Sequence, residues 1–205
     1  MKVCITLHGF NVRDKGKDST DKLGIRLSQK GVKWIQMDYR WVFLLGAKYL
    51  NSSLSKRLDK TVAEEKEKGV SEVIVIGHSN GCAIAMRQML HGSTVADKYI
   101  LINPALKRDL VERIPGDVKK IVCYHSRHDY PTQAAKWASK IPVVNFLIPE
   151  LWGAAGAWGL DSDDLRVKNI EENRIFGDNY VLHSDVFADE TIDKFSEHVY
   201  NEIMS

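Results

Sequence analysis

The segment GHSNG at residues 77–81 restricts the fold of this chain more than any other feature. It follows residues 73–76, the most strongly β-branched run in the sequence, and precedes CAIAMRQML, a good helix former. A tight turn between a strand and a helix leaves no room for Cβ atoms at its flanking positions, so Gly77 and Gly81 fit there. The motif therefore predicts a strand, a sharp turn that carries Ser79, and a helix.

Short apolar runs alternate with longer amphipathic segments along the rest of the chain. The pattern predicts helices at residues 19–30, within 42–68, after Ser79 and at about 190–204, and strands at 3–7, 32–37, 73–76, 99–102, 121–124 and 180–182. Strands that alternate with helices pair in parallel through right-handed crossovers. We therefore expect a single α/β domain over residues 1–205, built on a doubly wound, mostly parallel sheet.

A serine, an acid and a histidine follow three of the predicted strands. They are Ser79, Asp129 and His183, in that chain order, and the reactive groups of such sheets lie at the carboxyl ends of the strands. A serine hydroxyl is a poor nucleophile near neutral pH and needs a base within reach. The helix after Ser79 also directs free backbone N–H groups at the site, which favours a developing negative charge. Ser79 is thus the predicted nucleophile.

The general base must come from seven histidines, and His183 is the best candidate because it directly follows a short predicted strand. His8 and His78 flank two motif turns, where a structural role is expected. Asp129 is the only carboxylate in HSRHDYP and would orient His183 and stabilise its imidazolium form. Two alternatives stay open. His183 could be a surface or packing histidine, and Asp129 could cap the turn ahead of Pro131.

Potential metal ligands also gather in this segment. His125, His128 and Asp129 fall within five residues. Such a group is weak evidence for a metal centre, because no fourth residue lies at ligand spacing. We therefore expect no metal site.

These motifs, in this order, resemble those of the α/β-hydrolase family, with GHSNG as the nucleophile elbow. The resemblance covers most of the chain and implies hydrolysis through an acyl-serine intermediate, without a metal or organic cofactor. It also implies that His183, close to the C-terminus, is the base. The oxyanion hole is implied at the backbone N–H groups of Asn80 and of Phe10, which follows His8 and Gly9. The first strand corresponds to the third of the common fold, so the chain resembles a version trimmed at its N-terminus.

The chain also departs from the family pattern. Asn80 occupies the position after the nucleophile, where a small or hydrophobic residue is common, and no HGGG signature follows the first strand. These departures leave the predicted triad intact. They argue against assignment to a particular branch, such as the hormone-sensitive-type lipases.

An insertion is expected before the catalytic histidine. Between Asp129 and His183 lie 53 residues, more than a crossover helix needs. We expect residues 138–178 or so to form a cap or lid-like insertion, as the resemblance implies. Its apolar stretch at 141–160 has about the length that spans a bilayer, but two prolines and three glycines interrupt it. An integral membrane segment is therefore not expected.

Three tryptophans are candidates for the walls of a substrate pocket. Trp152 and Trp158 lie in the expected insertion, and Trp41 follows the second predicted strand. An apolar pocket would suit an ester or thioester with a hydrocarbon part. The same residues could equally belong to an ordinary core, and Trp152 and Trp158 could instead make weak contact with a lipid surface.

Charge and cysteine content narrow the class of protein. The 205 residues include 29 basic and 27 acidic side chains, for a net charge of +2. A nucleic-acid binder usually needs a large basic excess, so no nucleic-acid partner is expected. The three cysteines are widely spaced in apolar runs, which predicts buried free thiols in a reducing compartment. Because the first residues contain no long apolar segment, we expect a cytoplasmic protein.

Three functions are compatible with these features. The leading interpretation is a carboxylesterase-like serine hydrolase that acts on a small-molecule ester or thioester. An amidase or peptidase would use the same triad, although no feature of the sequence suggests a peptide pocket. The alternative from another class is a non-catalytic binding protein that retains the fold and uses the apolar insertion as a docking surface.

Overall fold

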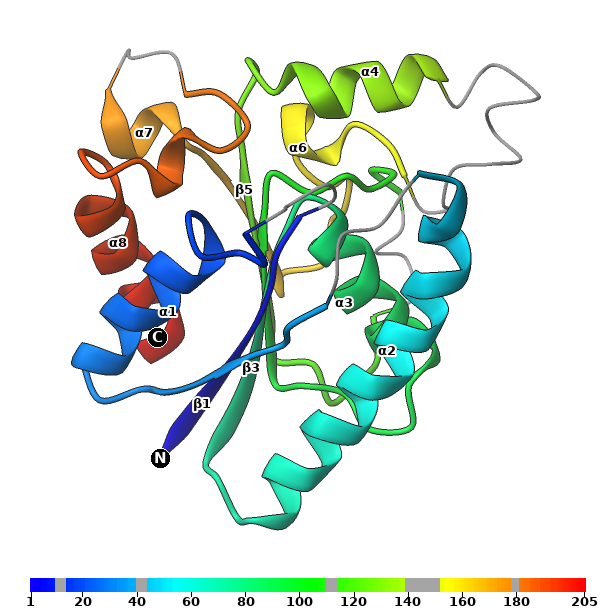
Figure 1. The fold of residues 1–205 in the computed structure, drawn as a ribbon, viewed down its shortest axis with the longest axis vertical. Helices are drawn as coiled ribbons and strands as arrows, with labels where there is room; N and C mark the ends of the chain where they lie inside the picture. The colour runs from blue at the N-terminus through cyan, green and yellow to red at the C-terminus, as the bar shows by residue number, and fades with distance from the viewer. Residues whose placement is uncertain (10–13, 40–43, 110–113, 139–151, 178–180) are drawn as a thin grey trace.

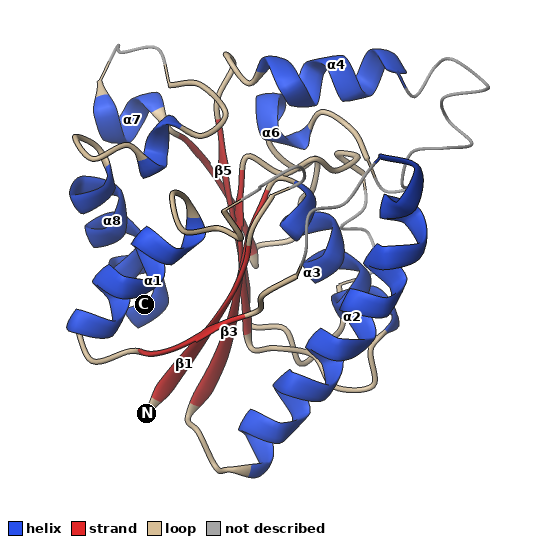
Figure 2. Cartoon of the chain, viewed as in Figure 1, coloured by secondary structure: helices blue, strands red, loops and turns tan. Residues whose placement is uncertain are grey.

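A parallel β-sheet forms the centre of the molecule (Figures 1 and 2). The structure is a computed structural model that describes residues 1–9, 14–39, 44–109, 114–138, 152–177 and 181–205. Within these residues the sheet has six strands in the order β2-β1-β3-β4-β5-β6, and all neighbouring pairs are parallel. The strands are β1 (Lys2–Leu7), β2 (Lys33–Gln36), β3 (Glu72–His78), β4 (Lys98–Ile102), β5 (Lys120–His125) and β6 (Val167–Glu171).

Helices cover both faces of this sheet. In Figure 1 the helices α1 (Thr20–Gln29) and α8 (Ile192–Met204) lie on one side, and α2 (Leu44–Glu67) and α3 (Asn80–His91) lie on the other. Shorter elements gather near the carboxyl ends of the strands, at the top of the view: α4 (Tyr130–Ala138), α6 (Ala155–Trp158), α7 (Asn173–Phe176) and the 3₁₀ turn η2 (Asp185–Phe187). The doubly wound parallel architecture expected from the sequence is confirmed.

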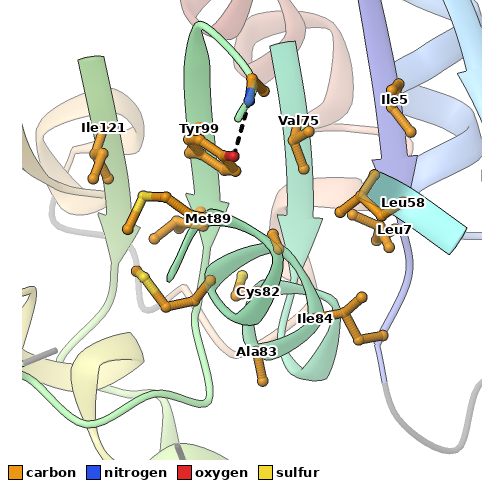
Figure 3. Packing of buried hydrophobic residues seen from close by; sticks show 14 of the residues in the cluster. Ile5, Leu7, Leu58, Val75, Cys82, Ala83, Ile84, Met89, Tyr99 and Ile121 are labelled. Carbon is orange, nitrogen blue, oxygen red and sulfur yellow. Dashed lines mark hydrogen bonds between the residues drawn. The ribbon is translucent and has the colours of Figure 1, made fainter. Parts of the chain in front are cut away.

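Two hydrophobic cores follow from the alternation of side chains along the strands. Val3, Ile5 and Leu7 pack with residues of α2 and α3 in one core, whereas Cys4 packs with residues of α1 in the other. Figure 3 shows the first core, in which α3 packs across the central strands. The hydroxyl of Tyr99 reaches a polar partner there, because it accepts a hydrogen bond from the backbone N–H of Ala96 at 3.0 Å. Strands buried on both faces by helices are typical of parallel sheets.

The sixth strand differs from the sequence-based expectation. β6 pairs with β5 inside the range 138–178 that was expected to form an insertion, so residues 167–171 belong to the sheet. Its sequence VKNIE is polar because it is an edge strand in which only Ile170 is buried. The strand expected at 180–182 was wrong for Val181 and Leu182, which lie in a loop, and residue 180 is outside the described residues. Val181 is apolar because it packs into the second core.

The described residues also bear on the expected state of the cysteines and on the expected lack of a membrane segment. Cys4, Cys82 and Cys123 are all buried and free, as expected. Among the helices that the structure describes, none combines the length and hydropathy needed to cross a membrane. Most of the apolar stretch at 141–160 lies outside the described residues.

Candidate active site

Ser79 occupies a strained turn between β3 and α3. Its backbone has φ 52° and ψ −117°, a conformation that costs on the order of 1–3 kcal/mol in a residue with a side chain. The turn is held from β4 and the loop after it: the N–H of Ser79 donates to the carbonyl of Ile102 at 3.0 Å, and the carbonyl of Ser79 accepts from the N–H of Ala105 at 3.3 Å. These bonds fix the partly exposed serine at the carboxyl end of the sheet.

The glycines around Ser79 allow the backbones to approach closely. A Cβ atom at Gly81 would lie 2.4 Å from the carbonyl oxygen of Leu7, and one at Gly77 would lie 2.8 Å from the backbone N of Cys82. Both distances are shorter than any carbon atom tolerates. On the other side of the turn, a Cβ at Gly9 would lie 3.2 Å from the Cβ of Ser79. The end of β1 therefore lies directly against the turn.

His183 and Asp129 lie within hydrogen-bonding distance, although 54 positions separate them in the chain. Nδ1 of His183 is 2.9 Å from Oδ1 of Asp129, whose side chain is fully buried. The same oxygen accepts the backbone N–H of Thr132 at 3.1 Å. The other oxygen, Oδ2, faces Gly156 of α6, where a Cβ would lie only 2.4 Å away. The carboxylate is thus held in one orientation, with one oxygen directed at the imidazole.

The backbone of His183 is held as well. Its carbonyl oxygen lies 3.0 Å from Nε2 of His78 and 3.1 Å from Nδ2 of Asn103. Burial, together with the neighbouring His183, lowers the pKa of His78 to about 3. His78 is therefore neutral near pH 7, and the carbonyl partner requires the tautomer that carries its proton on Nε2.

The side chain of Asn80 explains why a polar residue fits after the nucleophile. It is buried and forms a reciprocal amide pair with Asn51 of α2, with both N–O distances at 3.0 Å. Its Oδ1 also accepts a hydrogen bond from the indole Nε1 of Trp152 at 3.0 Å. The backbone N–H of Asn80 belongs to the first turn of α3, where N–H groups lack partners inside the helix. The side-chain bonds therefore hold the residue whose backbone N–H is the predicted oxyanion donor.

The turn that ends β1 is anchored through His8. The ring of His8 stacks on that of Tyr39, with centroids 3.8 Å apart, and its Nε2 lies 3.0 Å from the carbonyl oxygen of Tyr39. The Tyr39 hydroxyl in turn donates to the carbonyl of His8. Phe10 and Trp41 lie outside the described residues. Their expected roles as an oxyanion donor and a pocket wall stay predictions, as do those of Asn80, Trp152 and Trp158.

The two other tryptophans differ in their surroundings. Trp152 is partly buried, packs against the core between the sheet and α3, and lies beside Asn80. Trp158 ends α6 and is 48% exposed. The described residues contain no group of three or more His, Cys, Asp or Glu side chains arranged to hold a metal ion.

Comparisons with known proteins identify the fold. No family model matches the sequence, and no curated protein matches it. Solved structures do match along nearly the whole chain. One is a Xanthomonas campestris protein assigned to the α/β superfamily of hydrolases, with 20% identity, a TM-score of 0.56, and coverage of 97% of this chain and 98% of that one.

Two esterases are also similar in structure. The Pyrococcus furiosus esterase has a TM-score of 0.62 at 12% identity and is matched over 99% of this chain and 81% of its own. The esterase from Exiguobacterium antarcticum has a TM-score of 0.51 at 17% identity, over 100% of this chain and 92% of its own. This chain has the α/β-hydrolase fold. At these identities the likeness concerns the architecture alone.

Two buried residues of this α/β-hydrolase fold were not among the sequence-predicted site residues. Asn103, at the end of β4, donates through Nδ2 to Oε1 of Glu172 at 2.9 Å as well as to the carbonyl of His183. Glu172 directly follows β6 and is fully buried. Burial and the negative charge of Asp129 raise the pKa of Glu172 well above its ordinary value. The position of Asn103 directly after a strand was the only sequence signal for either residue.

Proposed function

We propose that this protein is a serine hydrolase that cleaves a carboxylic ester or thioester through an acyl-serine intermediate. Ser79 is the nucleophile, His183 the general base and Asp129 the acid that orients it. The observation that carries the proposal is the 2.9 Å contact between Nδ1 of His183 and Oδ1 of Asp129 at the edge of the sheet where the strained turn presents Ser79. The esterase neighbours in structure support the same reaction class.

In the first half-reaction the hydroxyl oxygen of Ser79 attacks the substrate carbonyl carbon while Nε2 of His183 takes its proton. The carbonyl oxygen becomes an oxyanion, which the backbone N–H of Asn80 and, by resemblance, that of Phe10 stabilise. The intermediate then collapses, the carbon–oxygen or carbon–sulfur bond to the leaving group breaks, and the leaving group receives the proton from His183. Water repeats the sequence on the acyl-serine and regenerates the free hydroxyl.

Asp129 supports both proton transfers. Its Oδ1 accepts the Nδ1 proton of His183, so Nε2 is left free to face the serine. A buried carboxylate also stabilises the positive charge that appears on the imidazole in the transition state. The Thr132 N–H keeps Oδ1 in place as the charge develops.

We further propose that Trp152 forms one wall of an apolar acyl pocket. Its indole is bonded to Asn80, the residue whose backbone N–H faces the developing oxyanion, so the wall begins directly beside the reacting carbonyl. A small-molecule substrate with a hydrocarbon acyl part fits such a wall.

A fluorophosphonate probe tests the proposal directly, because it reacts with serines that are activated by a base. We expect the wild-type protein to be labelled and the adduct to map to Ser79. Ser79→Ala should lose the label, and Ser28→Ala, which changes an exposed serine of α1, should keep it. Labelling that persists in Ser79→Ala would refute the assignment.

Substrate class requires a second measurement. We expect turnover of p-nitrophenyl esters, with a dependence on acyl-chain length, and no turnover of a panel of aminoacyl amides. Preferential turnover of the amides would instead identify an amidase or peptidase. No reaction with either panel or with the probe would identify a binding protein that retains the fold.

A further inference from the structure

We propose that Asn103 and His78 are positioning residues that hold the catalytic histidine through the main-chain carbonyl of His183. The inference rests on the proposed function and extends it to residues that touch neither the substrate nor the reacting atoms. Asn103 directly follows β4, and His78 is the histidine of the GHSNG motif.

The carbonyl oxygen of His183 is fully used by these two donors. Such an oxygen has two lone pairs, and it accepts one hydrogen bond from Nε2 of His78 at 3.0 Å and one from Nδ2 of Asn103 at 3.1 Å. The donors come from the ends of two adjacent strands, β3 and β4. Asp129 holds the imidazole of the same residue from the loop after β5. Main chain and side chain are therefore fixed by three neighbouring strands.

Asn103 is fixed in turn by its own backbone and by Glu172. Its φ angle is +44°, a left-handed conformation that asparagine adopts more readily than most residues, and its N–H donates to the carbonyl of Tyr124 at 2.9 Å. Its Nδ2 has two hydrogens and two acceptors, the carbonyl of His183 and Oε1 of Glu172. This pair of acceptors determines the orientation of the amide, because Oδ1 in the same place would face two oxygens.

The segment that carries His183 needs such support. Leu182 and Ser184, on either side of it, are exposed, and the segment lies outside the sheet. A base that is displaced by about 1 Å from its reactive position costs on the order of a hundredfold in rate. Two hydrogen bonds to the backbone of the base limit that displacement while leaving the imidazole free to exchange protons with Ser79.

Substitutions at Asn103 provide the main test. Asn103→Gly keeps the left-handed backbone without strain and removes both side-chain bonds, and Asn103→Asp keeps the shape but replaces the donor with an acceptor. We expect both variants to lower kcat for a p-nitrophenyl ester at least tenfold and to change KM less than twofold. Gln88→Leu is the matched control, because it removes a buried amide near the C-terminal end of α3, whereas Ser79 lies at the N-terminal end of this helix. The kcat of this control should stay within twofold of wild type.

Substitutions at His78 separate its hydrogen bond from its packing. Glutamine can place an amide N–H near the position of Nε2, whereas leucine fills space without a donor. We expect His78→Leu to lose at least tenfold in kcat and His78→Gln to recover most of that loss. Because both residues act on one carbonyl, the double variant Asn103→Gly/His78→Leu should lose less than the product of the single losses.

The outcomes distinguish this inference from the proposed function. If the wild-type protein does not react with a fluorophosphonate at Ser79, the proposed function fails. If it reacts and folded Asn103→Gly and Asn103→Asp keep wild-type kcat, only the role of Asn103 fails. Equal kcat for His78→Leu and His78→Gln would refute the role of His78. If Gln88→Leu lost as much kcat as Asn103→Gly, the loss in Asn103→Gly would reflect reduced stability, and the positioning role of Asn103 would be refuted. Thermal unfolding of each variant identifies those that are folded at the assay temperature.

Discussion

The indole of Trp152 donates a hydrogen bond to Oδ1 of Asn80 at 3.0 Å, which joins the segment after α4 to the residue that follows the nucleophile. The residue that we propose as a wall of the substrate pocket and the residue that we propose as an oxyanion donor are thereby connected by a single contact. Changes in the wall should therefore affect both the choice of acyl group and the rate of acylation.

Replacement of Trp152 should alter the preference for acyl-chain length. Trp152→Ala removes the wall, and loss of the contact with an apolar acyl chain should lower kcat/KM for long p-nitrophenyl esters about tenfold relative to the acetate, equivalent to about 1.4 kcal/mol. Trp152→Phe keeps an aromatic surface and should keep the preference. Trp158→Ala, which changes a side chain that is 48% exposed, is the comparison variant. An altered preference in Trp158→Ala alone would place the pocket elsewhere.

The amide pair between Asn51 and Asn80 should contribute to stability as a unit. Each single alanine variant removes both hydrogen bonds of the pair and leaves the other buried amide with unpaired polar atoms, which costs about 1–3 kcal/mol. In urea unfolding, the double variant should cost less than the sum of the single variants by about 0.5–3 kcal/mol. Asn201→Ala, at an exposed position of α8, should change stability by less than about 0.5 kcal/mol. Strict additivity would show that the pair does not act as one interaction.

Asp129→Asn should abolish most activity without unfolding the protein. The amide can still accept the Thr132 N–H, but its NH₂ group favours the wrong tautomer of His183. By analogy with other serine triads, kcat for ester hydrolysis should fall on the order of 10⁴-fold. Asp163→Asn, at an exposed loop position, serves as the control. Retention of more than a tenth of the wild-type kcat by Asp129→Asn would remove Asp129 from the triad.

Gly81→Ala should be strongly destabilising, because the new Cβ would lie 2.4 Å from the carbonyl oxygen of Leu7 and would force β1 and α3 apart. Overpacking of this kind typically costs about 1–3 kcal/mol and sometimes more. Gly116→Ala is the matched control, because a Cβ there would meet no atom within 4 Å. A wild-type unfolding midpoint in Gly81→Ala would contradict the close approach of the two backbones.

Glu172 should make the protein less stable as the pH rises above about 4.3, the ordinary pKa of glutamate. Burial and Asp129 raise the pKa of Glu172 in the folded state, so the native protein retains a proton that the unfolded chain loses. The contribution of Glu172 to stability therefore falls between the unfolded and the folded pKa, by about 1.4 kcal/mol for each unit that separates them.

Glu172→Gln isolates this effect, because the amide is neutral at every pH and keeps an acceptor for Asn103. We expect this variant to become more stable relative to the wild type, in unfolding free energy, as the pH rises from 4 to 8. Urea unfolding at several pH values measures the difference. A difference that does not change with pH would contradict a protonated Glu172.

The features that sequence patterns predicted share a local origin. Five of the six described strands and the turn at Ser79 were expected because a run of apolar residues or a pair of glycines carries the signal within a few positions. β6 was missed because an edge strand buries only Ile170 and otherwise has the polar composition of a loop. A strand was wrongly expected at Val181 because this residue is apolar. Val181 is apolar because it packs into a core, although it does not join the sheet.

The hydrogen bonds around the proposed triad could not be predicted from the sequence, because they join residues that are far apart in the chain. Asn103 and Glu172 are 69 positions apart, and His78 and His183 are 105 positions apart. No local pattern relates the members of such pairs. Asp129 and His183 were predicted from the order of polar residues after predicted strands and from the family resemblance, although the strand expected before His183 is a loop in the structure.

The position of His183 after all six described strands also bears on the order in which the protein becomes active during synthesis. A chain emerging from the ribosome presents the residues of β6, which ends at Glu171, before it presents His183, the residue proposed to accept the Ser79 proton. The residues of the sheet, the turn at Ser79 and the buried Asp129 are therefore all synthesised before the proposed base. A nascent chain that ends before residue 183 would lack the proposed base, so the proposed hydrolysis would begin only after His183 had been added.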